Sequence, residues 1–187
     1  AMADNPEWVE DMFNTYLDIN LAMMQMVLDA GYPVDEIYWP DDMGYKGTTF
    51  FSPRLYRELL QPVHARAVRW AHQKGVYANL HSCGDVMSLM DDILVTGVDA
   101  LNPLEVKAGM DSLLLKQKYG DRLVLQGGIN AVLWDQKDAI IAEIERLVPA
   151  LKQGGGYIFS SDHSIPNSVS AENFRAILDT VKRVGRY

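Results

Sequence analysis

Hydrophobic and polar positions alternate along the chain with two different periods. Residues 6–30 place apolar side chains at the spacing of an amphipathic helix that ends before Gly31. The apolar run DEIYWPDD, residues 35–42, predicts a strand, and residues 52–75 predict a long helix that opens with a Ser-Pro cap. Pro62 lies within this helix and is expected to kink it, because proline has no backbone N–H to donate.

The same alternation of strand and helix continues to the carboxyl terminus. Four further strands are predicted at residues 76–83, 98–105, 123–130 and 157–164, with helices at about 85–97 and 111–120, a helix that ends at Gly154, and a final helix from about Ser170. Strands that alternate with helices form a parallel sheet, whose functional loops lie at the carboxyl ends of the strands.

These patterns predict an α/β fold that forms a single domain over residues 1–187. Five parallel strand-helix units are too few for a closed (β/α)8 barrel, which typically needs about 250 residues. We therefore expect a partial TIM barrel of about five parallel βα units.

Composition narrows the class of function. The chain has a net charge of −8 and no cluster of Lys and Arg of the kind that binds a phosphate backbone, so a nucleic-acid partner is not expected. No apolar run reaches the roughly 20 residues that a membrane span needs. The single cysteine cannot form an internal disulfide, which suits a reducing cytoplasm. A cytoplasmic enzyme that acts on a small molecule is the expected class.

The only cysteine lies two residues after a histidine, in the stretch NLHSCGD. In the strand predicted at 76–83, a period of two puts Asn79, His81 and Cys83 on one face and small apolar residues on the other. His81 and Cys83 then lie at the carboxyl end of a strand, where barrel enzymes keep their active sites. An imidazole and a thiolate can bind zinc, and His163, at the end of the last strand, is the expected third ligand.

Other interpretations of these residues stay open. An isolated His-x-Cys pair is a weak motif, and a buried cysteine is more often a small hydrophobic residue. His64 and His72 lie in the long helix, where a histidine usually serves packing or faces solvent, so neither receives a functional role.

Several acidic or amide side chains also follow strand ends. Asp41 and Asp42 are consecutive, and neighbouring residues of a strand point to opposite faces, so only one of them is expected to reach the site. Glu105 and Gln126 lie near the same rim, where each can equally satisfy a loop backbone.

The motifs DDMG, SPRLYRELLQP, HSCGD, LNPLE, LQGGIN and GGGYIFSSDHSIPNSVSAENF follow one another along nearly the whole chain. In this order they resemble the carboxyl-terminal half of the uroporphyrinogen decarboxylase superfamily. The resemblance implies a (β/α)8 barrel, of which this chain supplies roughly strands four to eight.

Two chemistries are known in that superfamily. Its decarboxylases remove acetate carboxyl groups from uroporphyrinogen without a metal or an organic cofactor, whereas its methyltransferases use zinc to activate a thiol that takes a methyl group from a corrinoid. His81 and Cys83 match the His-x-Cys pair of the zinc methyltransferases, and His163 stands about where these enzymes have a final cysteine. Decarboxylases also have a histidine there, in a Gly-His-Gly stretch, but here Asp162 and Ser164 flank it.

The resemblance favours zinc-dependent methyl transfer from a corrinoid to a thiol. His81, Cys83 and His163 are then the zinc ligands, and Asp42 is the catalytic residue that orients a ligand. The alternative is a uroporphyrinogen decarboxylase of porphyrin and haem biosynthesis. A site for a substrate with about eight carboxylates is expected to contain arginines, because a guanidinium group donates two parallel hydrogen bonds to a carboxylate. The arginines of this chain lie on helices or at a strand start. The implied partners are a small-molecule thiol or porphyrinogen and a corrinoid protein.

A non-enzymatic alternative is an inactive half-barrel that self-associates. A sheet cut from a barrel leaves two edge strands, here 35–42 and 157–164, with unpaired backbone groups. We therefore expect a homo-oligomer that covers these edges. We also expect the chain on its own to be inactive, because sites in this fold draw residues from several strands.

Overall fold

Strands and helices alternate along the chain as its hydrophobic pattern predicts. The structure, a computed structural model that describes residues 1–186, contains a five-stranded sheet in the order β1-β4-β5-β6-β7. These strands are β1 (Glu36–Pro40), β4 (Tyr77–His81), β5 (Ala100–Asn102), β6 (Val124–Gln126) and β7 (Tyr157–Ile158). Every neighbouring pair is parallel, which confirms the predicted α/β fold of a partial TIM barrel.

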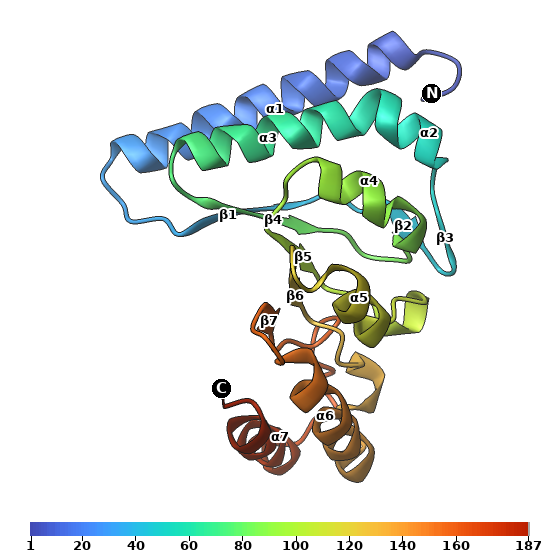
Figure 1. The fold of residues 1–187 in the computed structure, drawn as a ribbon, viewed down its shortest axis with the longest axis vertical. Coiled ribbons are helices and arrows are strands. Elements are labelled where there is room, and N and C mark those ends of the chain that lie inside the picture. Colours follow the sequence, from blue (N-terminus) through green and yellow to red (C-terminus); the bar gives the residue numbers. More distant parts are fainter. Residues whose placement is uncertain (187) are drawn as a thin grey trace.

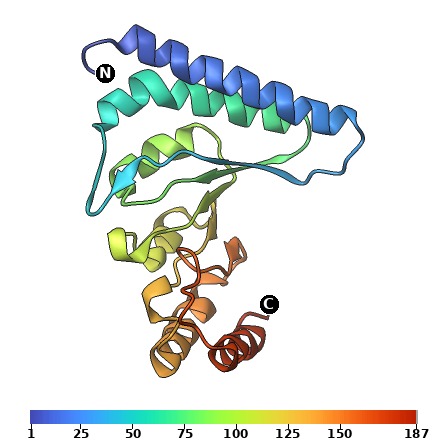
Figure 2. The same cartoon turned by 180° about the vertical axis from the view of Figure 1, so that it is seen from behind.

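Helices link the strands and pack beside them. They are α1 (Pro6–Asp29), α2 (Pro53–Leu55), α3 (Gln61–Gln73), α4 (Met90–Val95), α5 (Ser112–Tyr119), α6 (Lys137–Leu151) and α7 (Ala171–Val184). The pair α1 and α3 lies side by side along β1 and β4, and the pair α6 and α7 lies side by side at the other end of the molecule (Figure 1, Figure 2). No helix in the described part of the chain has the length and apolar character needed to cross a membrane.

Buried leucines hold the strands in register. Leu80 of β4 pairs with Leu101 of β5, which pairs in turn with Leu125 of β6, and all three are buried. Ala78 is buried on the same face of β4, as expected for the face that packs against helices. Burial of one leucine side chain stabilises a fold by about 1.5–3 kcal/mol relative to exposure. A slip of one residue would move this whole layer to the wrong face, so the register of the strand ends is fixed.

The long helix predicted for residues 52–75 is interrupted. A π-helical turn, Tyr56–Leu60, follows α2, and α3 begins at Gln61. Pro62 comes directly after this turn, as the second residue of α3. Proline has no backbone N–H to donate, so the helical run lacks one hydrogen bond at this position, and the wider π-helical turn lies just before it.

Two other features differ from the sequence-based prediction. An antiparallel hairpin of β2 (Gly44–Tyr45) and β3 (Thr48–Thr49) follows β1, in a segment where no strand was predicted. The last strand ends at Ile158, well before residue 164. Beyond it the chain bends, Ser161 forms only an isolated parallel bridge with Ile129, and Asp162 accepts hydrogen bonds from the backbones of two other loops.

Candidate functional site

The candidate site lies where β1 and β4 end. These strands pair in parallel with Pro40 opposite His81, so Asp42, two residues beyond Pro40, comes opposite Cys83. The backbone N–H of Asp41 donates to the carbonyl oxygen of His81 at 2.8 Å. The N–H of Cys83 donates to Asp42 Oδ1 at 2.9 Å. Strand register thus joins two segments that are far apart in the sequence.

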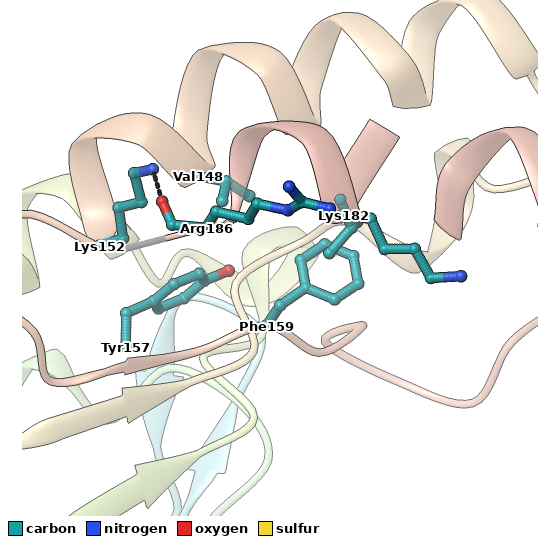
Figure 3. A pocket seen from close by; sticks show the side chains of 8 residues that line it. Val148, Lys152, Tyr157, Phe159, Lys182 and Arg186 are labelled. Atoms are coloured by element: carbon teal, nitrogen blue, oxygen red, sulfur yellow. Dashed lines mark hydrogen bonds between the residues drawn. The ribbon is translucent and has the colours of Figure 1, made fainter. Parts of the chain in front are cut away.

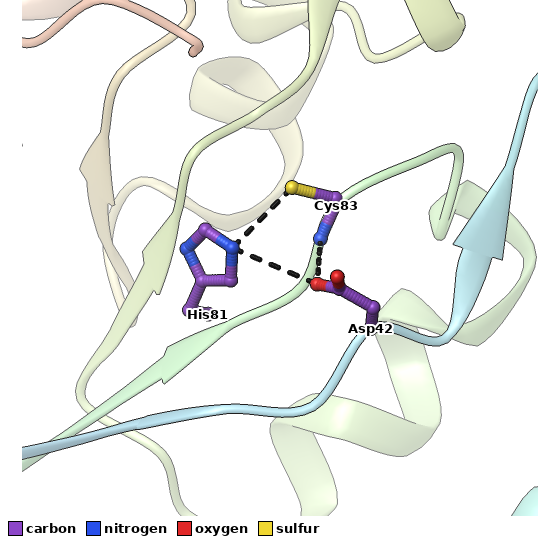
Figure 4. Close-up of side chains that lie close together, drawn as sticks. All are labelled: Asp42, His81 and Cys83. Carbon is purple, nitrogen blue, oxygen red and sulfur yellow. Dashed lines mark hydrogen bonds and ion pairs between the residues drawn. The ribbon is translucent and has the colours of Figure 1, made fainter. Parts of the chain in front are cut away.

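Asp42, His81 and Cys83 form a compact cluster (Figure 4). His81 Nε2 lies 3.3 Å from Cys83 Sγ and 3.6 Å from Asp42 Oδ1. One ligand atom from each of the three residues lies within 4.8 Å of the other two. His81 and Cys83 are half-buried and Asp42 is exposed, so the cluster has an open side.

Neighbouring strands orient the His81 ring. His81 Nδ1 lies 2.5 Å from Asn102 Oδ1 at the end of β5 and 2.7 Å from the hydroxyl of Tyr38 on β1. Because Asn102 Oδ1 can only accept, Nδ1 carries the ring proton and donates it, which leaves the lone pair of Nε2 facing Cys83 and Asp42. Such hydrogen bonds to the second nitrogen are typical of metal-binding histidines. No sequence motif indicated Tyr38 or Asn102. Their strand positions do, because Asn102 pairs with His81 across β5 and β4, and Tyr38 lies two residues before Pro40, which pairs with His81 on the other side.

The electrostatics of the cluster favour a cation. Burial, followed by the negative charges of Asp42 and Glu105, raises the pKa of the Cys83 thiol to about 11. Burial, with Cys83 and Asp42 next in importance, also raises the pKa of Tyr38. In the metal-free protein, the negative neighbours disfavour a negative charge on the Cys83 sulfur. A bound cation would favour that charge and so lower the pKa of the thiol.

The donor atoms fit zinc. Thiolate sulfur, imidazole nitrogen and carboxylate oxygen are the ligands that zinc takes in proteins, and three protein ligands with one open position are typical of catalytic zinc sites. Of the three cluster residues, Cys83 lines a hollow of about 300 Å³. It is lined by Gly44, Tyr45, Lys46, Cys83, Gly84, Glu105, Lys107 and Ala108.

The structure does not bring His163 into this cluster. His163 is exposed, and the described residues that gather around His81 and Cys83 include Asp42 instead. Its neighbour Asp162 is fully buried and accepts hydrogen bonds from the N–H groups of Val106 and Ala131. Asp162 thereby ties the end of β7 to two loops, and the chain turns His163 outward. The sequence-based choice of His163 as third ligand is not supported by this placement.

The two other rim residues serve the scaffold. Glu105 Oε2 accepts a hydrogen bond from the N–H of Gly84 at 2.7 Å, which corresponds to the loop-binding alternative for this residue. Gln126 Oε1 accepts from the side-chain amide of Asn79 at 3.0 Å, across β4 and β6. Glu105 thus holds the loop after Cys83 and Gln126 holds β4, and neither joins the cluster.

A second hollow, of about 350 Å³, lies between α6, β7 and α7 (Figure 3). Val148, Tyr157 and Phe159 contribute apolar walls, and the amine of Lys182 points away from them (Figure 3). Among the described residues that line it there is no His, Cys, Asp or Glu. This hollow therefore lacks the side chains that usually bind metal ions in proteins.

Comparison with known proteins gives consistent results. Residues 1–184 match the family described as uroporphyrinogen decarboxylase. A uroporphyrinogen decarboxylase from Nitrosospira multiformis is 29% identical over 94% of this chain and 48% of its own length. One from Neisseria meningitidis is 22% identical over 99% of this chain and 51% of its own length. The chain thus spans about half the length of the curated relatives that it matches.

A solved structure supports the fold. A methyltransferase from Methanosarcina mazei superposes with a TM-score of 0.57 at 22% sequence identity, covering 80% of this chain and 42% of that protein. At this level of identity the likeness concerns the fold alone. The parallel sheet, the order of the motifs and the family match over residues 1–184 together establish that the chain belongs to the uroporphyrinogen decarboxylase family.

Proposed function

We propose that Asp42, His81 and Cys83 form the zinc site of a thiol methyltransferase within the uroporphyrinogen decarboxylase family. The observation that carries this proposal is the cluster itself, in which sulfur, nitrogen and oxygen donors lie within 4.8 Å of one another. It stands at the carboxyl ends of neighbouring parallel strands, where barrel enzymes carry out their chemistry. Decarboxylation without a metal would not use these donors as metal ligands.

The residues of the chain have distinct parts in this proposal. Asn102 and Tyr38 orient the His81 ring so that Nε2 faces the cluster. Asp42 adds negative charge, and Cys83 must lose its proton to become a ligand. Zinc, when bound, supplies a Lewis acid that lowers the pKa of a thiol substrate toward neutrality. The hollow beside Cys83 offers room for a small thiol.

The proposed methyl donor is a corrinoid, carried by a corrinoid protein. In such a transfer the thiol would first lose its proton, and the S–C bond of the thioether would form as the Co–C bond breaks. Cobalt would keep the electron pair of that bond and pass from Co(III) to Co(I). Because sites in this fold draw residues from several strands, we expect turnover only when the complementary strands of the barrel accompany this chain.

The names of the curated relatives favour a second candidate. Both relatives described above are uroporphyrinogen decarboxylases, so removal of carboxyl groups from a porphyrinogen is the alternative activity. It predicts that Asp42, His81 and Cys83 serve substrate binding and that metal chelators leave the activity unchanged.

Zinc analysis tests the favoured proposal. We expect about one zinc ion per chain after dialysis against zinc, and we expect Cys83→Ser to remove it and Asp42→Asn to weaken it by at least about 10-fold. His163→Asn is the matched control and should keep full zinc content, because His163 is exposed and outside the cluster. Zinc content that survives Cys83→Ser would contradict the site, and loss of zinc in His163→Asn would restore His163 as a ligand.

Product analysis separates the two activities. The chain is combined with the amino-terminal half of a related decarboxylase and supplied with methylcobalamin and a thiol, or with uroporphyrinogen. Thioether formation that stops on chelation supports methyl transfer. Release of carbon dioxide that persists in the presence of a chelator supports the decarboxylase.

A further inference from the structure

A buried chain of hydrogen bonds lies on the outer side of the β1 end, behind the cluster. The hydroxyl of Tyr56 is 3.0 Å from His64 Nδ1, and His64 Nε2 is 2.9 Å from Asp41 Oδ2. Tyr56 is 0% exposed and His64 is 2% exposed. Asp41, the immediate neighbour of Asp42, is the only member of the three that reaches the surface of the rim. Two polar side chains are thus buried in the core, and both end on this carboxylate.

The direction of these hydrogen bonds is fixed. Asp41 Oδ2 is a carboxylate oxygen and accepts, so the ring proton of His64 is on Nε2, which donates to it. Nδ1 of the ring then accepts from the hydroxyl of Tyr56. Burial, with the charges of Asp41 and Asp92 next in importance, raises the pKa of Tyr56 well above its ordinary value, so the hydroxyl has this proton to donate. Trp39 of β1 meets the His64 ring edge-on, with the centroids 6.0 Å apart, and further limits its orientation.

The π-helical turn explains why Tyr56 and His64 can meet. In a regular α-helix, residues seven apart are only about 20° out of line, whereas residues eight apart differ by about 80°. The π-helical turn Tyr56–Leu60 adds one residue between Tyr56 and His64. The two side chains, eight residues apart, therefore lie on the same side of the helix, as residues seven apart do in a regular α-helix. Such turns are rare and are found frequently at functional sites.

This chain of contacts continues to the cluster through the backbone. Asp41 donates its N–H to the carbonyl oxygen of His81, while its side chain accepts from His64 on the opposite face. The next residue, Asp42, accepts from the N–H of Cys83. The short segment that follows β1 is therefore held from the inside by β4 and from the outside by α3.

We propose that Tyr56 and His64 are positioning residues that hold Asp42 at ligand distance from His81 and Cys83. The value of this inference for catalysis rests on the proposed metal site, but the placement of Asp42 can be measured without metal. Loss of His64 would free the Asp41 side chain and loosen the hydrogen bond between Asp42 and Cys83.

The first test follows the amide of Cys83 in the metal-free protein, by hydrogen exchange. We expect His64→Leu to speed exchange of this amide by at least about 5-fold, as for the loss of one ordinary hydrogen bond. His64→Gln should restore protection, because its amide can donate to Asp41 and its oxygen can accept from Tyr56. Tyr56→Phe removes one hydroxyl only, keeps the shape of the core, and should give an intermediate rate, so it carries the test if His64→Leu does not fold.

The second test measures metal binding by the same variants. Zinc affinity is expected to fall about 10-fold in His64→Leu, as for other groups that orient metal ligands, and to recover in His64→Gln. The absorption spectrum of the Co²⁺-loaded protein, which reports ligand geometry, should change and recover in parallel. His72→Leu is the matched control, since His72 lies on the same helix and binds Asp99 at 2.8 Å, away from the cluster.

The outcomes separate this inference from the proposed function. Unchanged Cys83 exchange in both His64→Leu and Tyr56→Phe would overturn it, as would an equal change in His72→Leu. A wild-type protein that binds no zinc would overturn the metal site, and the exchange rates would still decide whether Tyr56 and His64 position Asp42.

Discussion

Asp41 and Asp42 are identical neighbours in the sequence but have different surroundings. Asp42 accepts a hydrogen bond from Cys83 in the cluster, and Asp41 accepts one from His64 on the other side of the strand. The period of two continues past the end of β1, so Asp42 lies beside His81 and Cys83 while the side chain of Asp41 lies on the other face, as expected for two consecutive acids. Of these two acids, Asp42 is the one whose charge raises the pKa of the Cys83 thiol.

The reactivity of Cys83 tests this charge effect. Because burial and then Asp42 raise the pKa of the thiol to about 11, little thiolate is present near neutral pH in the metal-free protein. We expect the rate of alkylation by iodoacetamide to rise about 10-fold per pH unit from about pH 8 to about pH 10, without a plateau. Asp42→Asn removes a negative neighbour, lowers the pKa and should speed alkylation at about pH 8.

The exposed acid Asp121 supplies the control for this experiment. Asp121→Asn changes the net charge by the same amount, but Asp121 lies before β6, outside the cluster, and should leave the alkylation rate unchanged. A plateau near about pH 8.5, the ordinary range of a free cysteine, would show that Cys83 is not shielded as described.

At the scale of elements, the loops after β1 and β4 are locked by a close backbone approach. A Cβ atom on Gly84 would lie 2.1 Å from the carbonyl carbon of Gly44, and the N–H of Gly44 donates to the carbonyl oxygen of Cys83 at 3.2 Å. The loop that carries Asp42 can cross the loop that carries Cys83 only because both crossing residues lack side chains.

Substitution of Gly84 measures this contact. Gly84 has a φ of +83°, and Gly75 has a φ of +74° with nothing within 4 Å of an added Cβ. Gly75→Ala therefore reports the backbone strain alone, about 1–2 kcal/mol of unfolding free energy. Gly84→Ala adds a clash with backbone and should cost at least about 3 kcal/mol, measured by urea denaturation. Equal losses in the two variants would mean that the loops do not need to approach so closely.

At the scale of the whole molecule, the sheet has two open edges. The strand order places β1 and β7 at the ends, as predicted for residues 35–42 and 157–164. Apolar side chains also lie bare on α1, where Met12, Tyr16, Ile19, Met23 and Met26 are each at least half exposed and follow a four-three spacing. A surface of this kind is typical of a face that packs against another helix.

We expect the isolated chain to self-associate through these surfaces. Sedimentation at micromolar concentration should show a dimer or a larger oligomer, and Met23→Glu should shift it toward the monomer, because a charge on the exposed face of α1 disfavours burial. Val95→Glu changes a residue of α4 that is more exposed than Met23 and should leave the distribution unchanged. A stable monomer of 21.0 kDa that melts cooperatively would contradict this expectation.

Local patterns were sufficient to predict most elements and the sheet. Apolar periodicity, Ser-Pro caps and glycine helix ends depend on residues close together in the sequence, and alternating units of this kind have few topologies open to them. The same reasoning correctly placed His81 and Cys83 at a strand end. Local patterns did not predict the π-helical turn or the β2–β3 hairpin, because both depend on contacts with other elements of the fold.

The sequence by itself determined the partial α/β barrel, the family and the end of the sheet at which polar side chains gather. Only the tertiary structure decided which of them meet. Parallel register placed Asp42 opposite Cys83, the burial of Asp162 turned His163 outward, and one extra residue in a helical turn brought Tyr56 to His64. Each of these outcomes depends on distances between segments remote in sequence, which neither periodicity nor spacing encodes.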